Sequence, residues 1–127
     1  MNRVLVDTSV WRKYFGGAMA AKPLGALLED AGFVLVHPFI VGELLLGGLS
    51  QREEKLFELL PNADVVSHDE VLELVKRRRL ARRGIGWVDA HLLASALTSS
   101  AQLWAMDADL QKVATDLNID FHSELTT

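Results

Sequence analysis

The stretch Arg3-Val4-Leu5-Val6-Asp7-Thr8-Ser9 (RVLVDTS) joins a short apolar run to a residue that commonly caps helices. Every position from Val4 to Val6 is apolar, which is typical of a strand buried on both faces. Asp7 is a favoured helix N-cap, so the sequence predicts a strand over 3–7 and a helix over 8–15. A strand of this kind indicates a parallel sheet covered by helices on both sides.

The same alternation of apolar runs and helical patterns continues along the chain. We expect further helices over residues 19–31, 39–46, 51–60, 68–83, 88–98 and 108–117. We expect further strands over residues 33–36, 64–67, 102–106 and 119–121. No internal repeat, low-complexity tract or linker interrupts the pattern. The sequence therefore predicts an α/β fold with a mainly parallel central sheet, in a single domain over residues 1–127.

The composition of the chain excludes several classes of site and of protein. The chain has 127 residues, of which 50% are hydrophobic and 24% charged, so it can bury a core. It has no cysteine, which excludes disulfides, thiolate zinc sites and a cysteine nucleophile. No apolar run approaches the roughly 18 residues that span a bilayer, and the N-terminal apolar run is too short for a signal peptide. We therefore expect a cytoplasmic protein without membrane contact.

Charge is unevenly distributed along the sequence. Thirteen Lys and Arg stand against seventeen Asp and Glu, for a net charge of −4. Six of the basic residues fall in one short window: Lys76, Arg77, Arg78, Arg79, Arg82 and Arg83. Three interpretations remain open: a solvated helix face, a surface that binds RNA phosphates, and contacts with acidic residues of a partner chain.

Acidic residues follow two of the predicted strands. Asp7 comes after the first strand, and Asp107 follows the strand over 102–106, with Asp109 two positions later. The carboxyl ends of the strands form the functional edge of an open parallel sheet, so these residues are candidates for a site. Each also stands where a helix begins, and capping alone would explain each one taken singly.

Two further carboxylates lie in apolar helical segments. Glu43 belongs to an otherwise apolar run over 39–46, and Asp89 lies near the start of the helix expected over 88–98. A carboxylate in such a helix either faces a narrow solvent-exposed edge or needs a compensating cation. Oxygen ligands without cysteine suit Mg²⁺ or Mn²⁺, which can activate water for phosphodiester hydrolysis.

The segments that carry these acids resemble the PIN-domain nucleases, and within them the VapC-type ribonuclease toxins. The four segments are Asp7-Thr8-Ser9-Val10-Trp11, Gly42-Glu43-Leu44, Asp89-Ala90-His91-Leu92-Leu93-Ala94 and Asp107-Ala108-Asp109-Leu110. The resemblance covers essentially the whole chain in order and spacing. It implies a three-layer α/β/α sandwich and endonucleolytic RNA cleavage that leaves a 5′-phosphate and a 3′-hydroxyl.

The resemblance also implies roles for individual residues. The carboxylates that would bind Mg²⁺ or Mn²⁺ and carry the catalysis are Asp7, Glu43, Asp89 and Asp107, with Asp109 as an additional metal ligand and Ser9 as a polar support. The family is usually homodimeric and is held inactive by a cognate antitoxin. This chain departs from the family at Ala105, where Thr is frequent, and at Leu110, where Phe is frequent.

Two other function classes remain as alternatives. A non-catalytic PIN-like module could bind protein or RNA, although such a module has no need for four carboxylates. A receiver-like or haloacid-dehalogenase-like domain is disfavoured, because no acid lies two residues after Asp7 and no lysine ends a later strand. Trp11 and Trp87 could stack on bases, but core packing is the simpler role for both, and Trp104 lies within a predicted strand.

Overall fold

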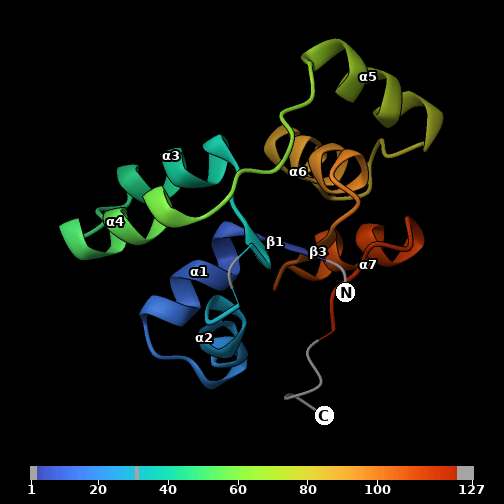
Figure 1. Ribbon diagram of the computed structural model, residues 1–127. Helices are drawn as coiled ribbons and strands as arrows, with labels where there is room; N and C mark the ends of the chain where they lie inside the picture. Colours follow the sequence, from blue (N-terminus) through green and yellow to red (C-terminus); the bar gives the residue numbers. More distant parts are fainter. Residues whose placement is uncertain (1–2, 31, 123–127) are drawn as a thin grey trace.

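A computed structural model of the protein describes residues 3–30 and 32–122 (Figure 1). Its centre is a three-stranded sheet in the order β2-β1-β3. The strands are β1 (Val4–Val6), β2 (Val34–Leu35) and β3 (Gln102–Trp104). Both neighbours run parallel to β1. Because parallel strands share the direction of their carboxyl ends, the residues that follow β1 and β3 emerge at the same edge.

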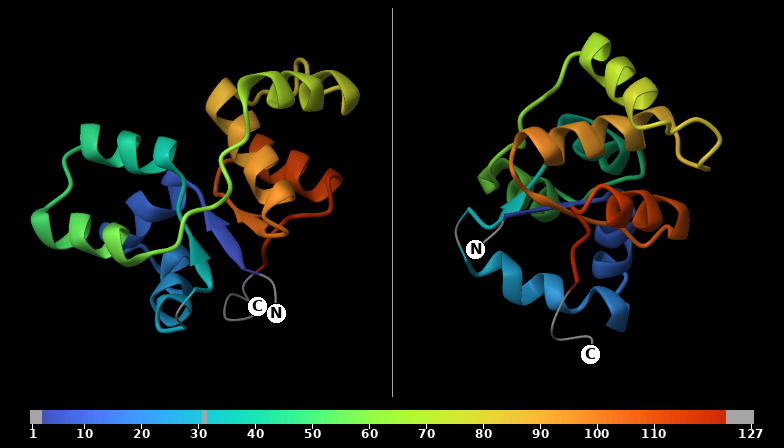
Figure 2. Two further views of the ribbon diagram at one scale, coloured as in Figure 1. Left: turned by 45° about the horizontal axis from the view of Figure 1, so that its top comes forward. Right: turned by 90° about the vertical axis from the view of Figure 1, so that its right-hand side faces the viewer.

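Helices cover both faces of this sheet. They are α1 (Thr8–Phe15), the 3-10 helix η1 (Met19–Ala21), α2 (Pro23–Leu28), α3 (Pro38–Leu46), α4 (Gln51–Leu59), α5 (His68–Arg77), α6 (Trp87–Thr98) and α7 (Ala108–Asp116). Figure 2 shows α5 and α6 on one side of the sheet and α1 and α2 on the other. The predicted α/β/α sandwich is confirmed. Within the described residues, no helix is both long and apolar enough to cross a membrane.

The core lies between the sheet and its two helical layers. All three residues of β1 are fully buried, as the continuous apolar run predicts. Leu92 and Leu93 of α6 and Val10 and Trp11 of α1 are also fully buried. Each such aliphatic side chain contributes about 1.5–3 kcal/mol of burial free energy, so the sheet and the helices that carry the acidic segments hold each other in place.

The predicted helix over 19–31 is wrong as a single element. Pro23 has no backbone N–H and begins a new helix, so the segment divides into η1 and α2. The strand predicted over 64–67 is also wrong: these residues form no strand, and the nearby sheet pairing is a single parallel bridge between Val36 and Asn62. The strand expected over 119–121 is likewise reduced to a bridge between Leu103 and Asp120.

The helix predicted over 68–83 ends much earlier, at Arg77. Arg79 adopts φ 53°, and the N–H of Leu80 donates to the carbonyl of Val75 at 3.0 Å. This bond, together with that from the Arg79 N–H to the Lys76 carbonyl, forms a Schellman motif. Leu80 is 4% exposed, and burying it beside the core turns the chain away from the helix axis. The basic window therefore lies largely on a turn.

His37 caps α3 from a fully buried position. Its Nδ1 accepts the N–H of Phe39 at 3.0 Å, while its Nε2 has no partner. Burial is the larger cause that lowers the pKa of His37 to about 4, and the nearby ring of His91 lowers it further. Because the unfolded chain binds a proton at about pH 6.5, the stability that His37 contributes is complete above that pH and is lost as the pH falls toward 4.

We expect the free energy of unfolding to fall by roughly 3 kcal/mol between pH 6.5 and 4 through His37. Urea titrations across this range measure the effect. His37→Asn keeps a side-chain oxygen that can accept the Phe39 N–H, so this variant retains the cap and loses most of the pH dependence. An unchanged slope in the variant would place the acid sensitivity elsewhere.

Candidate active site

Asp7 stands at the carboxyl end of β1 and caps α1. Its backbone N–H donates to the carbonyl of Trp104 at 2.9 Å, which continues the pairing with β3. Its Oδ2 accepts the backbone N–H of Ser9 at 3.1 Å and the Ser9 hydroxyl at 2.6 Å. The side chain is 7% exposed. These bonds fix one carboxylate oxygen of Asp7 and leave Oδ1 as the other acceptor.

Ser9 joins two strand ends. Besides donating to Asp7, its hydroxyl accepts the backbone N–H of Met106 at 3.1 Å. Met106 immediately precedes Asp107, which caps α7 by accepting the N–H of Leu110 at 2.9 Å. The two acids that follow strands therefore both act as helix caps, and one hydroxyl connects the segments that carry them.

Glu43 lies half-buried on α3. Its Oε1 accepts the hydroxyl proton of Thr8 at 3.0 Å. Thr8 is only 5% exposed and precedes Ser9, so adjacent hydroxyls at the start of α1 contact carboxylates from two different elements. The contact draws the side chain of Glu43 toward the end of β1.

Asp89 occupies the first turn of α6. Its Oδ2 accepts the N–H of Gly86 at 3.0 Å, so Gly86, and not Asp89, is the N-cap of this helix. Burial is the main cause that raises the pKa of Asp89, and the charges of three other acids raise it further, whereas the bond from Gly86 lowers it. Those acids are Asp7, Asp107 and Glu43. Asp89 therefore lies within electrostatic reach of the other three carboxylates.

Three of the four carboxylates line one open pocket of about 410 Å³. Its lining consists of Asp7, Thr8, Ser9, Arg12, Glu43, Gly86, Trp87, Val88 and Asp89. These residues come from the end of β1 and from α1, α3 and α6, so the tertiary fold is needed to bring them together. Asp107 and Asp109 lie outside the lining.

The donor chemistry of the pocket fits a hard divalent cation. Its acidic side chains are carboxylates, and the pKa of Asp89 is raised first by burial and then by the negative charges of the other acids. The carboxylates are spread around the pocket: in residues 3–30 and 32–122, no three Asp, Glu, His or Cys side chains form a ready group of metal ligands. A bound cation would therefore have to pull the carboxylates inward.

Asp109 lies against Gly84, which belongs to the turn that precedes α6. It is exposed in the first turn of α7, and its carboxylate packs against Gly84. A Cβ at Gly84 would overlap the carboxylate of Asp109, and Gly84 has φ 82°, a backbone conformation that favours glycine. This contact does not support the predicted role of Asp109 as an additional metal ligand, and that role stays a prediction.

In the sequence, the basic window precedes the residues at the start of α6 that line the acidic pocket. Lys76 and Arg77 end α5, and the remaining residues form the turn that leads to α6. Arg83 pairs with Asp116 of α7. In the part of the chain that the structure describes, the other basic residues of the window make no ion pair, and all of them are exposed.

Comparison with known proteins identifies the family. The sequence pattern described as PIN domain matches residues 4–116 of this chain. The chain belongs to the PIN domain family. It is 44% identical to Ribonuclease VapC32 in two strains of Mycobacterium tuberculosis, CDC 1551 / Oshkosh and H37Rv. Each alignment spans 129 positions and covers 97% of this chain and 99% of the relative. The resemblance that the acidic segments indicated is thus confirmed.

Two solved structures share the fold of this PIN domain. The toxin–antitoxin complex from Klebsiella pneumoniae matches with a TM-score of 0.63 and 19% identity, over 82% of this chain and 86% of that chain. PAE2754 from Pyrobaculum aerophilum matches with a TM-score of 0.55 and 16% identity, over 92% of this chain and 90% of that chain. At these identities the two matches support the architecture alone.

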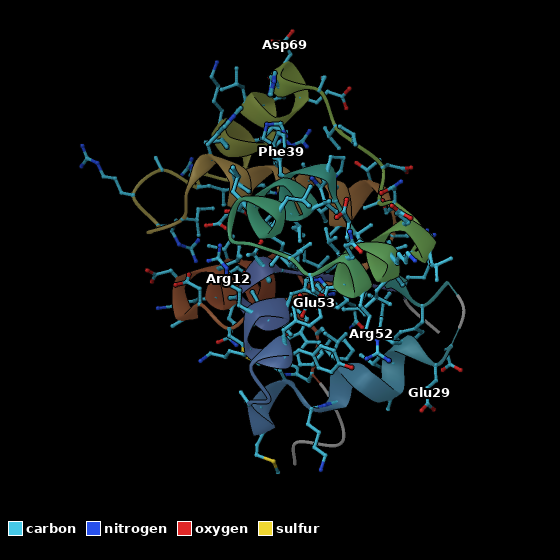
Figure 3. All side chains as sticks on the ribbon, turned by 90° about the vertical axis from the view of Figure 1, so that its left-hand side faces the viewer. Arg12, Glu29, Phe39, Arg52, Glu53 and Asp69 are labelled. Atoms are coloured by element: carbon cyan, nitrogen blue, oxygen red, sulfur yellow. The ribbon has the colours of Figure 1, made fainter. Side chains whose placement is uncertain are left out.

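Two residues that line the pocket of this PIN domain, Thr8 and Arg12, were not predicted from the sequence. Thr8 contacts Glu43, and Arg12 is the basic residue in the lining. Figure 3 shows Arg12 on α1. Residues four apart on a helix share a face, so Arg12 could have been placed beside Thr8 from the predicted start of α1. The contact between Thr8 and Glu43 could not have been predicted, because the two residues are 35 positions apart and no local pattern encodes the contact.

Charge repulsion in the PIN domain pocket leads to a stability prediction. We expect Asp89→Asn to raise the free energy of unfolding by about 0.5–2 kcal/mol in metal-free buffer, because the amide removes one buried charge and keeps an acceptor for Gly86. Urea denaturation in the presence of EDTA measures the change. The matched control Asp109→Asn should give no gain, because its charge is exposed at the N-terminus of α7. Equal stabilisation of both variants would contradict the proposed crowding at Asp89.

Proposed function

We propose that this protein is a VapC-type endoribonuclease toxin that hydrolyses RNA phosphodiester bonds in the presence of Mg²⁺ or Mn²⁺. The observation that carries the proposal is the convergence of Asp7, Glu43 and Asp89 on one pocket from separate elements. The identity to Ribonuclease VapC32 over nearly the full length supports the same activity. PIN ribonucleases are typically metal-dependent, which agrees with the carboxylate donor set.

Asp7, Glu43 and Asp89 would hold the cation, with Asp107 adding negative charge at the edge of the site. The bound ion supplies activation of a water molecule and neutralises charge that develops on the phosphoryl oxygen. The chain itself supplies orientation. The hydroxyls of Ser9 and Thr8 each donate a hydrogen bond to one carboxylate oxygen, which leaves the second oxygen of Asp7 and of Glu43 available as a ligand.

Arg12 would bind the substrate phosphate. Arg12 lines the acidic pocket, and in the described residues it forms no ion pair with a carboxylate. A guanidinium can pair with a phosphate through two parallel hydrogen bonds, which orients the phosphate as well as attracting it. This arrangement would offset the repulsion between an acidic site and a polyanionic substrate.

The exposed basic residues of the turn between α5 and α6 would bind neighbouring phosphates. The turn leads directly to α6, whose first residues reach the pocket, so an RNA backbone can contact both. Such contacts raise affinity without reading sequence. Of the three interpretations of the basic window, this one agrees best with its position. The proposed RNA substrate also agrees with the expected cytoplasmic location.

A cognate antitoxin would bind the apolar surface at the end of α3 and along α4. Leu45, Leu46 and Leu59 are 46%, 92% and 83% exposed, which is unusual for residues of this size. The leucines of α2 do not belong to this surface, because Leu24 is fully buried and Leu27 and Leu28 pack against the core. The same apolar residues could serve a homodimer, which remains an expectation from the family.

We expect Asp7→Asn and Glu43→Gln each to reduce Mg²⁺- or Mn²⁺-dependent RNA cleavage by roughly 100-fold or more, because each removes charge from the cation site. Gel analysis of a labelled single-stranded RNA measures the rates. Glu58→Gln makes the same chemical change on exposed α4 and should cleave at the wild-type rate.

The cation itself gives a second readout of that experiment. Saturating Mn²⁺, at about 100 times its Kd, should raise the free energy of unfolding of the wild type by about 2.7 kcal/mol, and that of the two variants by less. A folded wild type that neither cleaves RNA nor is stabilised by Mn²⁺ would favour the non-catalytic module.

We expect Arg82→Ala to weaken RNA binding for every sequence and to reduce the salt dependence of the binding constant by about one unit of slope. Fluorescence anisotropy at several NaCl concentrations measures both, in the Asp7→Asn background to prevent cleavage. Arg83→Ala is the matched control, because Arg83 already pairs with Asp116 and should affect binding less. Equal effects of the two variants would refute a role for Arg82 in phosphate binding.

A further inference from the structure

Trp87 is the exposed tryptophan of this protein. It begins α6 and is 43% exposed, whereas Trp11 and Trp104 are 0% and 7% exposed and belong to the core. Trp87 also lines the acidic pocket, two positions from Asp89. The core role that the sequence favoured therefore holds for Trp11 and fails for Trp87.

Two histidines hold the indole ring of Trp87. The ring of His91 lies 4.8 Å from it, centroid to centroid, at an interplanar angle of 88°, and the ring of His68 lies 6.0 Å away at 31°. His91 is 1% exposed, and its Nε2 shares a hydrogen bond of 3.0 Å with Nδ1 of His68. Phe39 of α3, labelled in Figure 3, packs on the His91 ring at 4.9 Å. The indole is thus oriented before any ligand arrives, so stacking on it costs little conformational entropy.

A second hollow, of about 200 Å³, lies against Trp87 and is separate from the acidic pocket. Its lining is Val75, Leu80, Ala81, Arg82, Ile85, Gly86, Trp87 and Ala90. Arg82 is exposed in this lining and has φ 63°. Trp87 therefore lies between a group of carboxylates and a cationic side chain, and the latter precedes it by only five residues along the chain.

We propose that Trp87 is the platform on which an unpaired RNA base stacks, next to the phosphodiester held over the acidic pocket, while Arg82 binds a neighbouring phosphate. The proposal rests on the proposed ribonuclease function and assigns to Trp87 and Arg82 the contacts with one base and one phosphate of the substrate. A base inside a duplex cannot offer its face to an indole, so the preferred substrate is a single-stranded segment or loop. Stacking accepts every base, so Trp87 selects for strandedness and not for sequence.

Intrinsic fluorescence tests the contact directly. Because Trp11 and Trp104 are buried, a ligand that stacks on the protein should quench the emission of Trp87 alone. We expect a short single-stranded RNA to quench the Asp7→Asn protein in Mg²⁺, and the same RNA with an abasic position at the bound nucleotide to quench it far less. In Asp7→Asn/Trp87→Phe, RNA should leave the remaining emission unchanged.

Binding measurements give the energetic test. In the Asp7→Asn background, Trp87→Leu should weaken binding of single-stranded RNA by roughly 5- to 150-fold, the range expected for loss of one stacked base, and Trp87→Phe by less. Leu72→Ala is the matched control, because Leu72 is 46% exposed on α5 outside both hollows, and it should bind as the parent does. Circular dichroism and thermal melting verify that each variant is folded.

Three results would overturn the proposal: unchanged emission at saturating RNA, unchanged affinity of folded Trp87→Leu, or equal affinity of the parent for duplex and single-stranded RNA. A Trp87→Leu variant that binds RNA normally but no longer binds an antitoxin would also overturn it and assign the indole to a protein partner. None of these depends on cleavage. Failure of the proposed ribonuclease function would appear separately, as a lack of metal-dependent cleavage by the wild type.

Discussion

The placement of several carboxylates in one partly buried pocket is the constraint on which the rest of this structure depends. Asp7, Glu43 and Asp89 line one pocket, and the charges of Asp7, Glu43 and Asp107 all contribute to the raised pKa of Asp89. The basic side chain in that lining is Arg12. A fold that keeps these charges close is less stable than one that disperses them, so its packing must supply the difference until a cation binds.

The parallel sheet and the hydroxyls of Thr8 and Ser9 hold these carboxylates in position. Adjacent strands β1 and β3 end at the same edge, and the bond from Asp7 to Trp104 fixes their relative register there. Ser9 then joins Asp7 to the loop before Asp107, and Thr8 reaches across to Glu43. Short hydroxyl side chains at the start of one helix thus connect carboxylates from distant segments, and each bond also satisfies a buried polar group.

The segment from Arg82 to Asp89 combines three different chemical functions within a short stretch of chain. Asp89 contributes charge to the pocket, Trp87 contributes an exposed aromatic face, and Arg82 precedes them on the turn from α5. The turn exists because Leu80 is buried and the Schellman motif at Arg79 ends α5. Because α5 ends before it, Arg82 lies on this turn and lines the hollow beside Trp87 together with Leu80.

The sequence by itself determined the alternation of strands and helices, the parallel sheet and the identity of the acidic candidates, because burial patterns and helix caps are local properties of the chain. The tertiary structure decided which candidates converge. Asp109 follows a strand closely, as Asp107 does, but it packs against Gly84 and does not line the pocket. Arg12 lines the pocket, although no sequence motif marks it. The end of α5 also depended on Leu80, whose burial is a contact with distant residues. Sequence spacing specifies where a residue lies along its element, while the direction of its side chain in space follows from how the elements pack.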